Sequence, residues 1–142
     1  MNILDNLKID EKILLKQNQN SEFYLTNYRL ILHNDKPDYI KIYSKNINQY
    51  GEVFEDYILL ELEYLKLIIL DDYIYGPEAY LYLGKGSNEG EFSKMKRNIK
   101  RKRIKFKTDI EIGIGFESFH IQNQFLLNII NLKPDIIIGG FS

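Results

Sequence analysis

Apolar and polar residues alternate along most of this chain, which is the pattern of half-buried β-strands. The clearest run covers residues 104–116, where every even position is Ile, Phe or Thr and every odd position is Lys, Asp, Glu or Gly. A period of two over this length predicts a long antiparallel strand with Ile112 on its buried face. We also predict a bulge or bend near Gly113.

The same alternation predicts shorter strands earlier in the chain, separated by polar turns. They lie at residues 13–15, 23–25, 30–32, 39–43 and 79–83. In the third of these, Leu30 and Leu32 should face inward and Arg29 and Ile31 outward. An almost continuous apolar stretch at 57–70 predicts one long strand, or a hairpin turning near Lys66, and Asp71–Asp72 should end it.

The apolar period becomes helical near the C-terminus. The repeating positions are Phe119, Ile121, Phe125, Leu126, Ile129 and Ile130. Ser118 suits the N-cap and Pro134 should stop the helix. The apolar tail at 135–142 predicts an edge strand that joins its own sheet or a second copy. The chain is therefore expected to be one mainly β domain over residues 1–142 with one C-terminal α-helix.

Several antiparallel strands followed by one helix suggest a strongly bent sheet, or a partly open barrel, that the helix caps. Three segments resemble bacterial PH-like (pleckstrin-homology-like, GRAM-related) domains: Phe23–Leu32 (FYLTNYRLIL), Glu11–Leu14 and Lys41–Ile47. The resemblance implies a PH-like fold, with headgroup binding in some relatives. The phosphoinositide site of that family uses Lys and Arg around the first hairpin loop, where residues 16–21 offer only Lys16.

Charge is distributed very unevenly, although the formal net charge is only −1. Nine of the fourteen residues at 94–107 are Lys or Arg and none is acidic, whereas the rest of the chain has ten basic and twenty acidic residues. Such asymmetry favours a polyanionic partner. The expected contact residues, within a basic insertion at 84–103, are Lys96, Arg97, Lys100, Arg101, Lys102 and Arg103.

The leading hypothesis is an adaptor-like binding module that recognises an anionic membrane surface or an acidic protein partner. One alternative is nucleic-acid binding by the same residues, and another is a structural subunit that forms a homo-oligomer through sheet edges and the apolar tail. A further alternative is that the basic run is a solvated loop or strand extension, with its charge offset by acidic residues of the same chain or of another copy.

Several chemistries find no support in the sequence. The chain has no cysteine, which excludes disulfides and thiolate sites, and its two histidines are His33 and His120. The loop Gly84–Gly90 lacks the order of a phosphate-binding motif. We therefore predict no catalytic residue, metal or cofactor, and no enzymatic activity. No signal peptide and no apolar run of ~20 residues is visible, so a cytoplasmic protein with at most peripheral membrane contact is expected.

Overall fold

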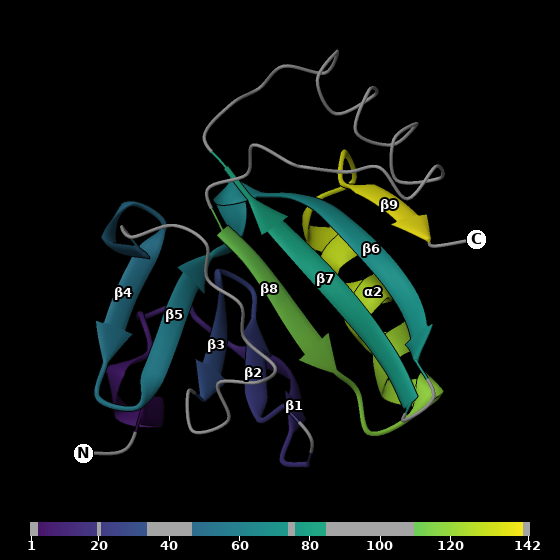
Figure 1. Ribbon diagram of the computed structural model, residues 1–142. Coiled ribbons are helices and arrows are strands. Elements are labelled where there is room, and N and C mark those ends of the chain that lie inside the picture. Colours follow the sequence, from purple (N-terminus) through teal and green to yellow (C-terminus); the bar gives the residue numbers. More distant parts are fainter. Residues whose placement is uncertain (1–2, 20, 34–46, 74–75, 85–109, 141–142) are drawn as a thin grey trace.

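The computed structural model describes residues 3–19, 21–33, 47–73, 76–84 and 110–140. Within these ranges the chain forms two β-sheets and one α-helix near the C-terminus (Figure 1). The predicted mainly β fold with one C-terminal helix is thus confirmed. Among the described strands, the two sheets stay separate and do not close into a barrel.

Sheet A is antiparallel throughout, with the strand order β1-β2-β3-β5-β4. Its strands are β1 (Ile13–Gln17), β2 (Phe23–Thr26), β3 (Arg29–His33), β4 (Gly51–Phe54) and β5 (Tyr57–Glu61). The 3₁₀ turn η1 (Ile3–Asn6) precedes β1, and the 3₁₀ turn η3 (Ile47–Gln49) precedes β4. Three of the predicted strands are therefore present here, whereas β4 was not predicted.

Sheet B has the order β8-β7-β6-β9 and contains β6 (Leu65–Tyr73), β7 (Gly76–Leu83), β8 (Ile110–Gly115) and β9 (Ile137–Gly140). Strand β9 pairs with β6 in parallel, and the other pairs are antiparallel. The apolar tail therefore adds an edge strand to its own sheet. This is the first of the two alternatives that the sequence left open.

The stretch at 57–70 is neither one strand nor a hairpin. Strand β5 ends at Glu61, the 3₁₀ turn η4 (Leu62–Tyr64) follows, and β6 begins at Leu65 in the other sheet. Leu62, the first residue of this turn, and Leu65, the first residue of β6, are buried in the same core, so the chain passes from one sheet to the other within that core. Asp71 and Asp72 do not end the strand, because β6 continues to Tyr73 while paired with β7.

One hydrophobic core joins both sheets and the helix α2 (Phe119–Leu132), which lies across one face of sheet B (Figure 1). Three aromatic rings meet in it: Phe23 of β2, Phe116 after β8 and Phe125 of α2. Their centroids lie 5.3–6.0 Å apart. Edge-to-face and tilted contacts of this kind stabilise by more than the buried area alone. Ile112 is fully buried in this core, as predicted.

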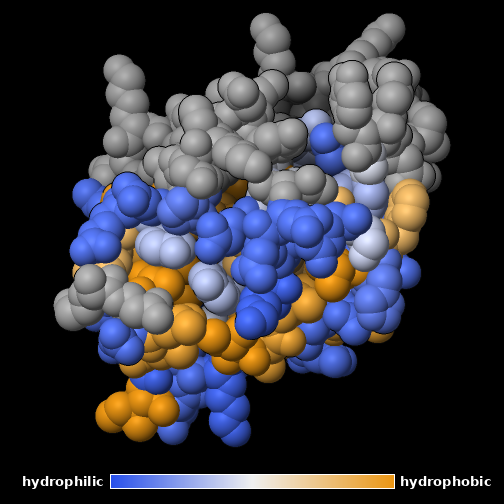
Figure 2. Space-filling model, turned by 90° about the horizontal axis from the view of Figure 1, so that it is seen from below, coloured by the Kyte–Doolittle hydropathy of each residue, from blue (hydrophilic) through white to orange (hydrophobic). Residues whose placement is uncertain are grey.

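Helix α2 begins and ends where the sequence predicted. The Ser118 hydroxyl accepts the Ile121 N–H at 3.2 Å, and the helix stops at Leu132, before Pro134. Its predicted apolar face was wrong at two positions, because Phe119 and Ile130 are 57% and 41% exposed. The buried residues of the helix, Gln122, Phe125 and Ile129, form a narrow stripe. Elsewhere on the molecule, hydrophobic residues also lie at the surface among hydrophilic ones, as on the face shown in Figure 2.

Three further points concern the predicted strands and their irregularities. The pairing of β8 with β7 is uninterrupted from Ile110 to Gly115, so the bulge near Gly113 is absent. The predicted strand at 39–43 and the first part of the 104–116 strand lie outside the described residues. The unpredicted strand β4 depends on Gly51, because a Cβ there would overlap the carbonyl oxygen of Leu59.

Both faces of sheet A carry buried apolar residues. Ile31 was expected to face outward, yet it is fully buried, as is Leu59 of β5. Both form a second, smaller core with Ile3 of η1. The N-terminal segment therefore covers the face of sheet A that alternation alone would leave to solvent.

Replacing Ile112 with Asp should abolish cooperative folding, since it would place an unpaired charge in the core that β8 shares with sheet A and α2. The matched control is Ile9→Asp, the same exchange at a fully exposed isoleucine, which should leave stability unchanged. Urea unfolding followed by circular dichroism measures both. A folded Ile112→Asp protein with the stability of the control would contradict the register of β8.

Candidate functional site

The six predicted contact residues, Lys96 to Arg103, lie outside the described part of the chain, within residues 85–109. The structure does describe where this segment is attached. Leu83 ends β7 and Ile110 begins β8, and these two residues are paired in sheet B. The N–H of Gly84 also bonds to the carbonyl oxygen of Tyr64 at 3.0 Å. Both ends of the basic segment are thus held at one end of sheet B (Figure 1).

The described residues are strongly acidic. They contain six Lys and Arg against fifteen Asp and Glu, a net charge of −9, whereas residues 85–109 contain ten basic and three acidic residues, a net charge of +7. The described part of the chain, with a net negative charge, is therefore joined at one end of sheet B to both ends of a segment with a net positive charge.

A buried ion pair lies beneath the hairpin that carries the family resemblance. The Arg29 guanidinium donates from Nε to Glu11 Oε2 at 2.9 Å and from Nη2 to Oε1 at 2.7 Å. The two side chains are only 4% and 0% exposed. Two parallel charge-assisted bonds form the strong, geometrically defined type of pair. Glu52 of β4 accepts a further bond from Arg29 Nη1 at 3.2 Å.

Two neighbouring polar side chains complete this Glu11–Arg29 network. The Thr26 hydroxyl donates to Glu11 Oε2 at 2.6 Å and accepts the Arg29 N–H at 2.9 Å. The Asn27 amide accepts the Lys12 N–H at 2.7 Å and donates to the Asp10 carbonyl at 2.9 Å. The Thr-Asn-x-Arg pattern therefore fastens residues 10–12 to the β2–β3 turn.

The network also sets the charge state of its members. Burial by itself would raise the pKa of Glu11, but hydrogen bonds from Arg29, Thr26 and the Lys8 N–H, with the positive charge of Arg29, outweigh it and lower the pKa. The bond to Glu11 raises the pKa of Arg29 against the opposing effect of burial. Both groups are therefore held in their charged forms.

Sequence reasoning did not identify Glu11 and Arg29 as partners and placed Arg29 on an outward face. That face is covered by the N-terminal segment, which alternation within β3 cannot reveal. The available signal was the resemblance itself, because it singled out Glu11 together with the Thr26–Arg29 segment.

A second buried polar group joins the two sheets. The Gln17 amide donates to the carbonyl oxygens of Gly115 and Ser21 at 2.8 and 2.7 Å and accepts the Glu117 N–H at 2.9 Å. The Ser21 hydroxyl accepts the Gly115 N–H at 3.1 Å. Backbone groups at the end of β8 are thus satisfied by side chains from the first hairpin.

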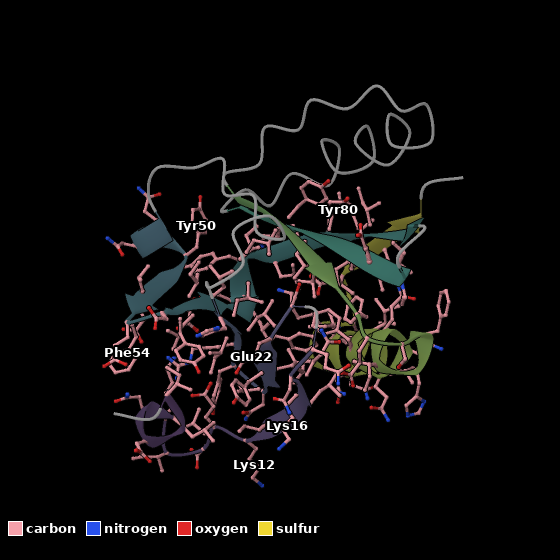
Figure 3. The ribbon with its side chains drawn as sticks, turned by 60° about the horizontal axis from the view of Figure 1, so that its bottom comes forward. Lys12, Lys16, Glu22, Tyr50, Phe54 and Tyr80 are labelled. Carbon is pink, nitrogen blue, oxygen red and sulfur yellow. The ribbon has the colours of Figure 1, made fainter. Side chains whose placement is uncertain are left out.

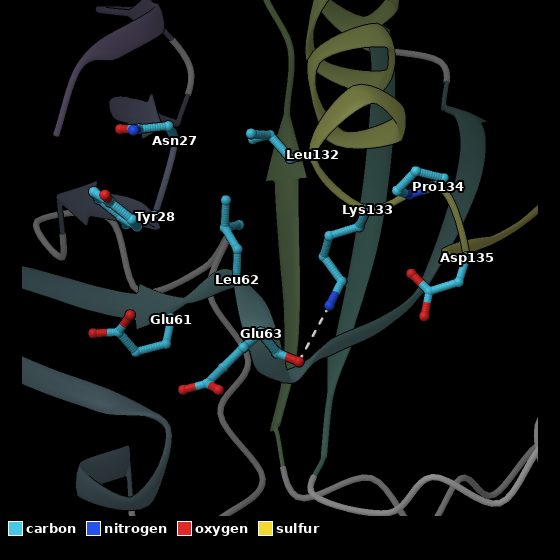
Figure 4. Close-up of a pocket in the computed structure, with 9 residues that line it drawn as sticks. All are labelled: Asn27, Tyr28, Glu61, Leu62, Glu63, Leu132, Lys133, Pro134 and Asp135. Atoms are coloured by element: carbon cyan, nitrogen blue, oxygen red, sulfur yellow. Dashed lines mark hydrogen bonds between the residues drawn. The ribbon is translucent and has the colours of Figure 1, made fainter. Parts of the chain in front are cut away.

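An open pocket of about 470 Å³ lies between the β2–β3 turn, η4 and the end of α2 (Figure 4). Its lining residues are Asn27, Tyr28, Glu61, Leu62, Glu63, Leu132, Lys133, Pro134 and Asp135. Lys133 donates to the Glu63 carbonyl oxygen at 3.1 Å. Burial, together with the nearby Lys66, lowers the pKa of Lys133.

The pocket has a mixed chemical character. Carboxylates of Glu61, Glu63 and Asp135 share it with the Lys133 amine, and Glu61 is paired with Lys8 at 3.3 Å. The lysine bond joins the helix end to the turn between the sheets, which is a structural role. Within the described ranges, no group of three or more His, Asp or Glu side chains is arranged to hold a metal ion.

The two histidines lie on different elements, His33 at the end of β3 and His120 in the first turn of α2. The basic residues of the first hairpin, Lys12 and Lys16, are exposed and point away from the core (Figure 3). None of the helices in the described part of the chain has the length and apolar character needed to cross a bilayer.

Comparisons of the chain with protein-family models, curated proteins and solved structures give no match. The resemblance of residues 10–50 to PH-like domains therefore stays a prediction.

The Glu11→Gln protein should unfold with a free energy lower by about 3 kcal/mol at neutral pH, because the buried Arg29 guanidinium loses the charge of Glu11 and keeps only the exposed Glu52 as an ionic partner. The pKa of Glu11 is lower in the folded protein than its ordinary value of 4.5. Its stabilising contribution is therefore complete above pH 4.5 and disappears as the pH falls through the folded pKa.

Urea unfolding between pH 7 and pH 3 should thus show a smaller loss of stability for Glu11→Gln than for the unaltered chain. Glu117→Gln, at an exposed carboxylate, is the matched control and should follow the unaltered chain. Equal stabilities of the two variants at neutral pH would contradict the role assigned to the network.

Proposed function

We propose that this protein is a non-enzymatic, adaptor-like binding module of PH-like fold that attaches to anionic membrane surfaces through Lys96, Arg97 and Lys100–Arg103. The observation that carries the proposal is the separation of charge. A body of net charge −9 is joined at one end of sheet B to a segment of net charge +7.

The magnitude of the attraction favours a membrane surface. Each basic residue near an anionic leaflet contributes about 1 kcal/mol, so half of the basic run would suffice to hold a protein of this size. The same leaflet repels the acidic body. A molecule with this distribution should therefore bind in one orientation, with the end of sheet B that carries Leu83 and Ile110 toward the lipid.

Two further observations support the PH-like part of the proposal. Glu11, Thr26 and Arg29, three of the residues that carry the resemblance, form one buried network, which gives this part of the motif a structural reason. The helix α2 packs on a core shared by two mainly antiparallel sheets, as expected of bent β-structure capped by one helix.

Flotation with liposomes tests the proposal. At ~0.15 M salt, where the screening length is ~8 Å, the protein should float with anionic vesicles and remain unbound with neutral ones. The Lys102→Glu/Arg103→Glu protein should lose most of this binding. The matched control is Lys12→Glu/Lys16→Glu, which makes the same charge change at exposed residues of the first hairpin and should bind as before.

Failure to float with anionic vesicles would contradict the proposal. Equal losses in both double variants would contradict the assignment to residues 96–103 and would indicate an effect of net charge alone. Duplex DNA binding without flotation, with a salt slope of about −0.9 per phosphate neutralised, would favour the nucleic-acid alternative.

A further inference from the structure

Strand β9 forms one edge of sheet B, and among the described strands it pairs only with β6. The other edges of the two described sheets are β1, β4 and β8. Each of these three contains one charged residue, namely Lys16, Glu52 and Glu111, whereas β9 contains only Ile and Gly. Charged residues commonly protect an open edge from pairing with another chain. Among the described edges, β9 is therefore the one best suited to accept a further strand.

The glycines of β9 support this conclusion. Glycine weakens a strand, because it loses much backbone freedom on folding and adds no side chain to the packing. Neither Gly139 nor Gly140 has the positive φ that would favour glycine, and a Cβ at Gly139 would meet no described atom within 4 Å. A glycine inside a strand often marks a place where another backbone approaches closely. At Gly139 that backbone would be the strand added at the edge.

Helix α2 has an apolar flank that sheet B leaves exposed. The buried stripe of the helix runs through Phe125. On one side of this stripe, Leu132 lines the pocket beside the β2–β3 turn and therefore faces sheet A. With about 3.6 residues per turn, Leu126, Ile130 and Phe119 lie on the opposite side of the stripe. Leu126 is partly buried in the main core, whereas Ile130 and Phe119 are exposed.

This exposed flank of α2 faces away from sheet A, toward the β9 edge. The first hairpin of sheet A is bonded to the end of β8, and β9 is at the opposite edge of sheet B. Figure 1 shows the same arrangement, with sheet A and β9 on opposite sides of sheet B. A strand added beside β9 would extend the sheet over the flank. It would also explain why the apolar face of the helix sequence is wider than the buried stripe.

We propose that the added strand is β9 of a second copy of this chain, so that two B sheets join about a two-fold axis. The partner strand must itself have an open, uncharged edge, and a second copy supplies one. Antiparallel pairing of β9 with itself is self-complementary, as a two-fold interface requires. No like charges meet across the axis, because residues 136–140 are all Ile or Gly. Each copy places the inward side chain of Ile138 over the exposed flank of the other copy's helix.

Sedimentation equilibrium tests this pairing. The mass of the unaltered chain should rise from that of a monomer toward twice that value as the protein concentration increases. Gly139→Lys should raise the dissociation constant roughly tenfold or more, because it brings two like charges together near the axis. The matched control is Val53→Lys, which adds the same charge to the edge strand β4 at a side chain that is 55% exposed. It should associate as the unaltered chain does.

Ile130→Lys is a second variant, at an exposed position of α2, and keeps the test decisive if Gly139→Lys misfolds. It should weaken the dimer several-fold, because the flank that the other copy covers becomes charged. A monomeric mass at every concentration would overturn the pairing. A dimer that neither variant weakens, or that Val53→Lys weakens as much, would also overturn it.

The pairing does not rest on the proposed function, since residues 96–103 take no part in it. Sedimentation and flotation therefore separate the two proposals. A dimer that does not float with anionic vesicles would support the pairing and contradict membrane binding. A monomer that floats would do the reverse.

Discussion

The N-terminal half of the structure depends on the buried pair of Glu11 and Arg29. Neither charge is accessible to water, so each requires the other, and the Thr26 hydroxyl and the Lys8 N–H satisfy the remaining oxygen sites of the carboxylate. The pair fixes the position of the N-terminal segment against the β2–β3 turn. Ile3 can then cover Ile31 and Leu59, and Arg29 reaches β4 through Glu52.

The sequence was most informative where local periodicity and burial agree. The strand around Ile112 and the helix between Ser118 and Leu132 could be predicted because one face of each packs on a single core. Alternation failed at Ile31, where a distant segment covers the second face. It also failed at 57–70, because an unbroken apolar run carries no signal for the point where the chain changes sheets.

The candidate site, too, could be predicted from the sequence only in part. The basic residues were evident from composition, and their attachment to paired positions of β7 and β8 adds geometry that composition cannot supply. The polar residues of the hairpin motif turn out to form buried hydrogen bonds with one another and with the N-terminal segment. The structural role falls on a body of net negative charge held by buried polar networks, whereas the binding role is proposed for the basic segment joined to one end of sheet B.

A double-mutant cycle at Glu11 and Arg29 tests most directly whether the hairpin motif is structural. It compares the unfolding free energies of the unaltered chain, Glu11→Gln, Arg29→Met and the double variant in urea at neutral pH. A favourable coupling of roughly 1–3 kcal/mol is predicted for residues joined in one buried network. A coupling near zero would show that the two charges contribute independently and would contradict the account.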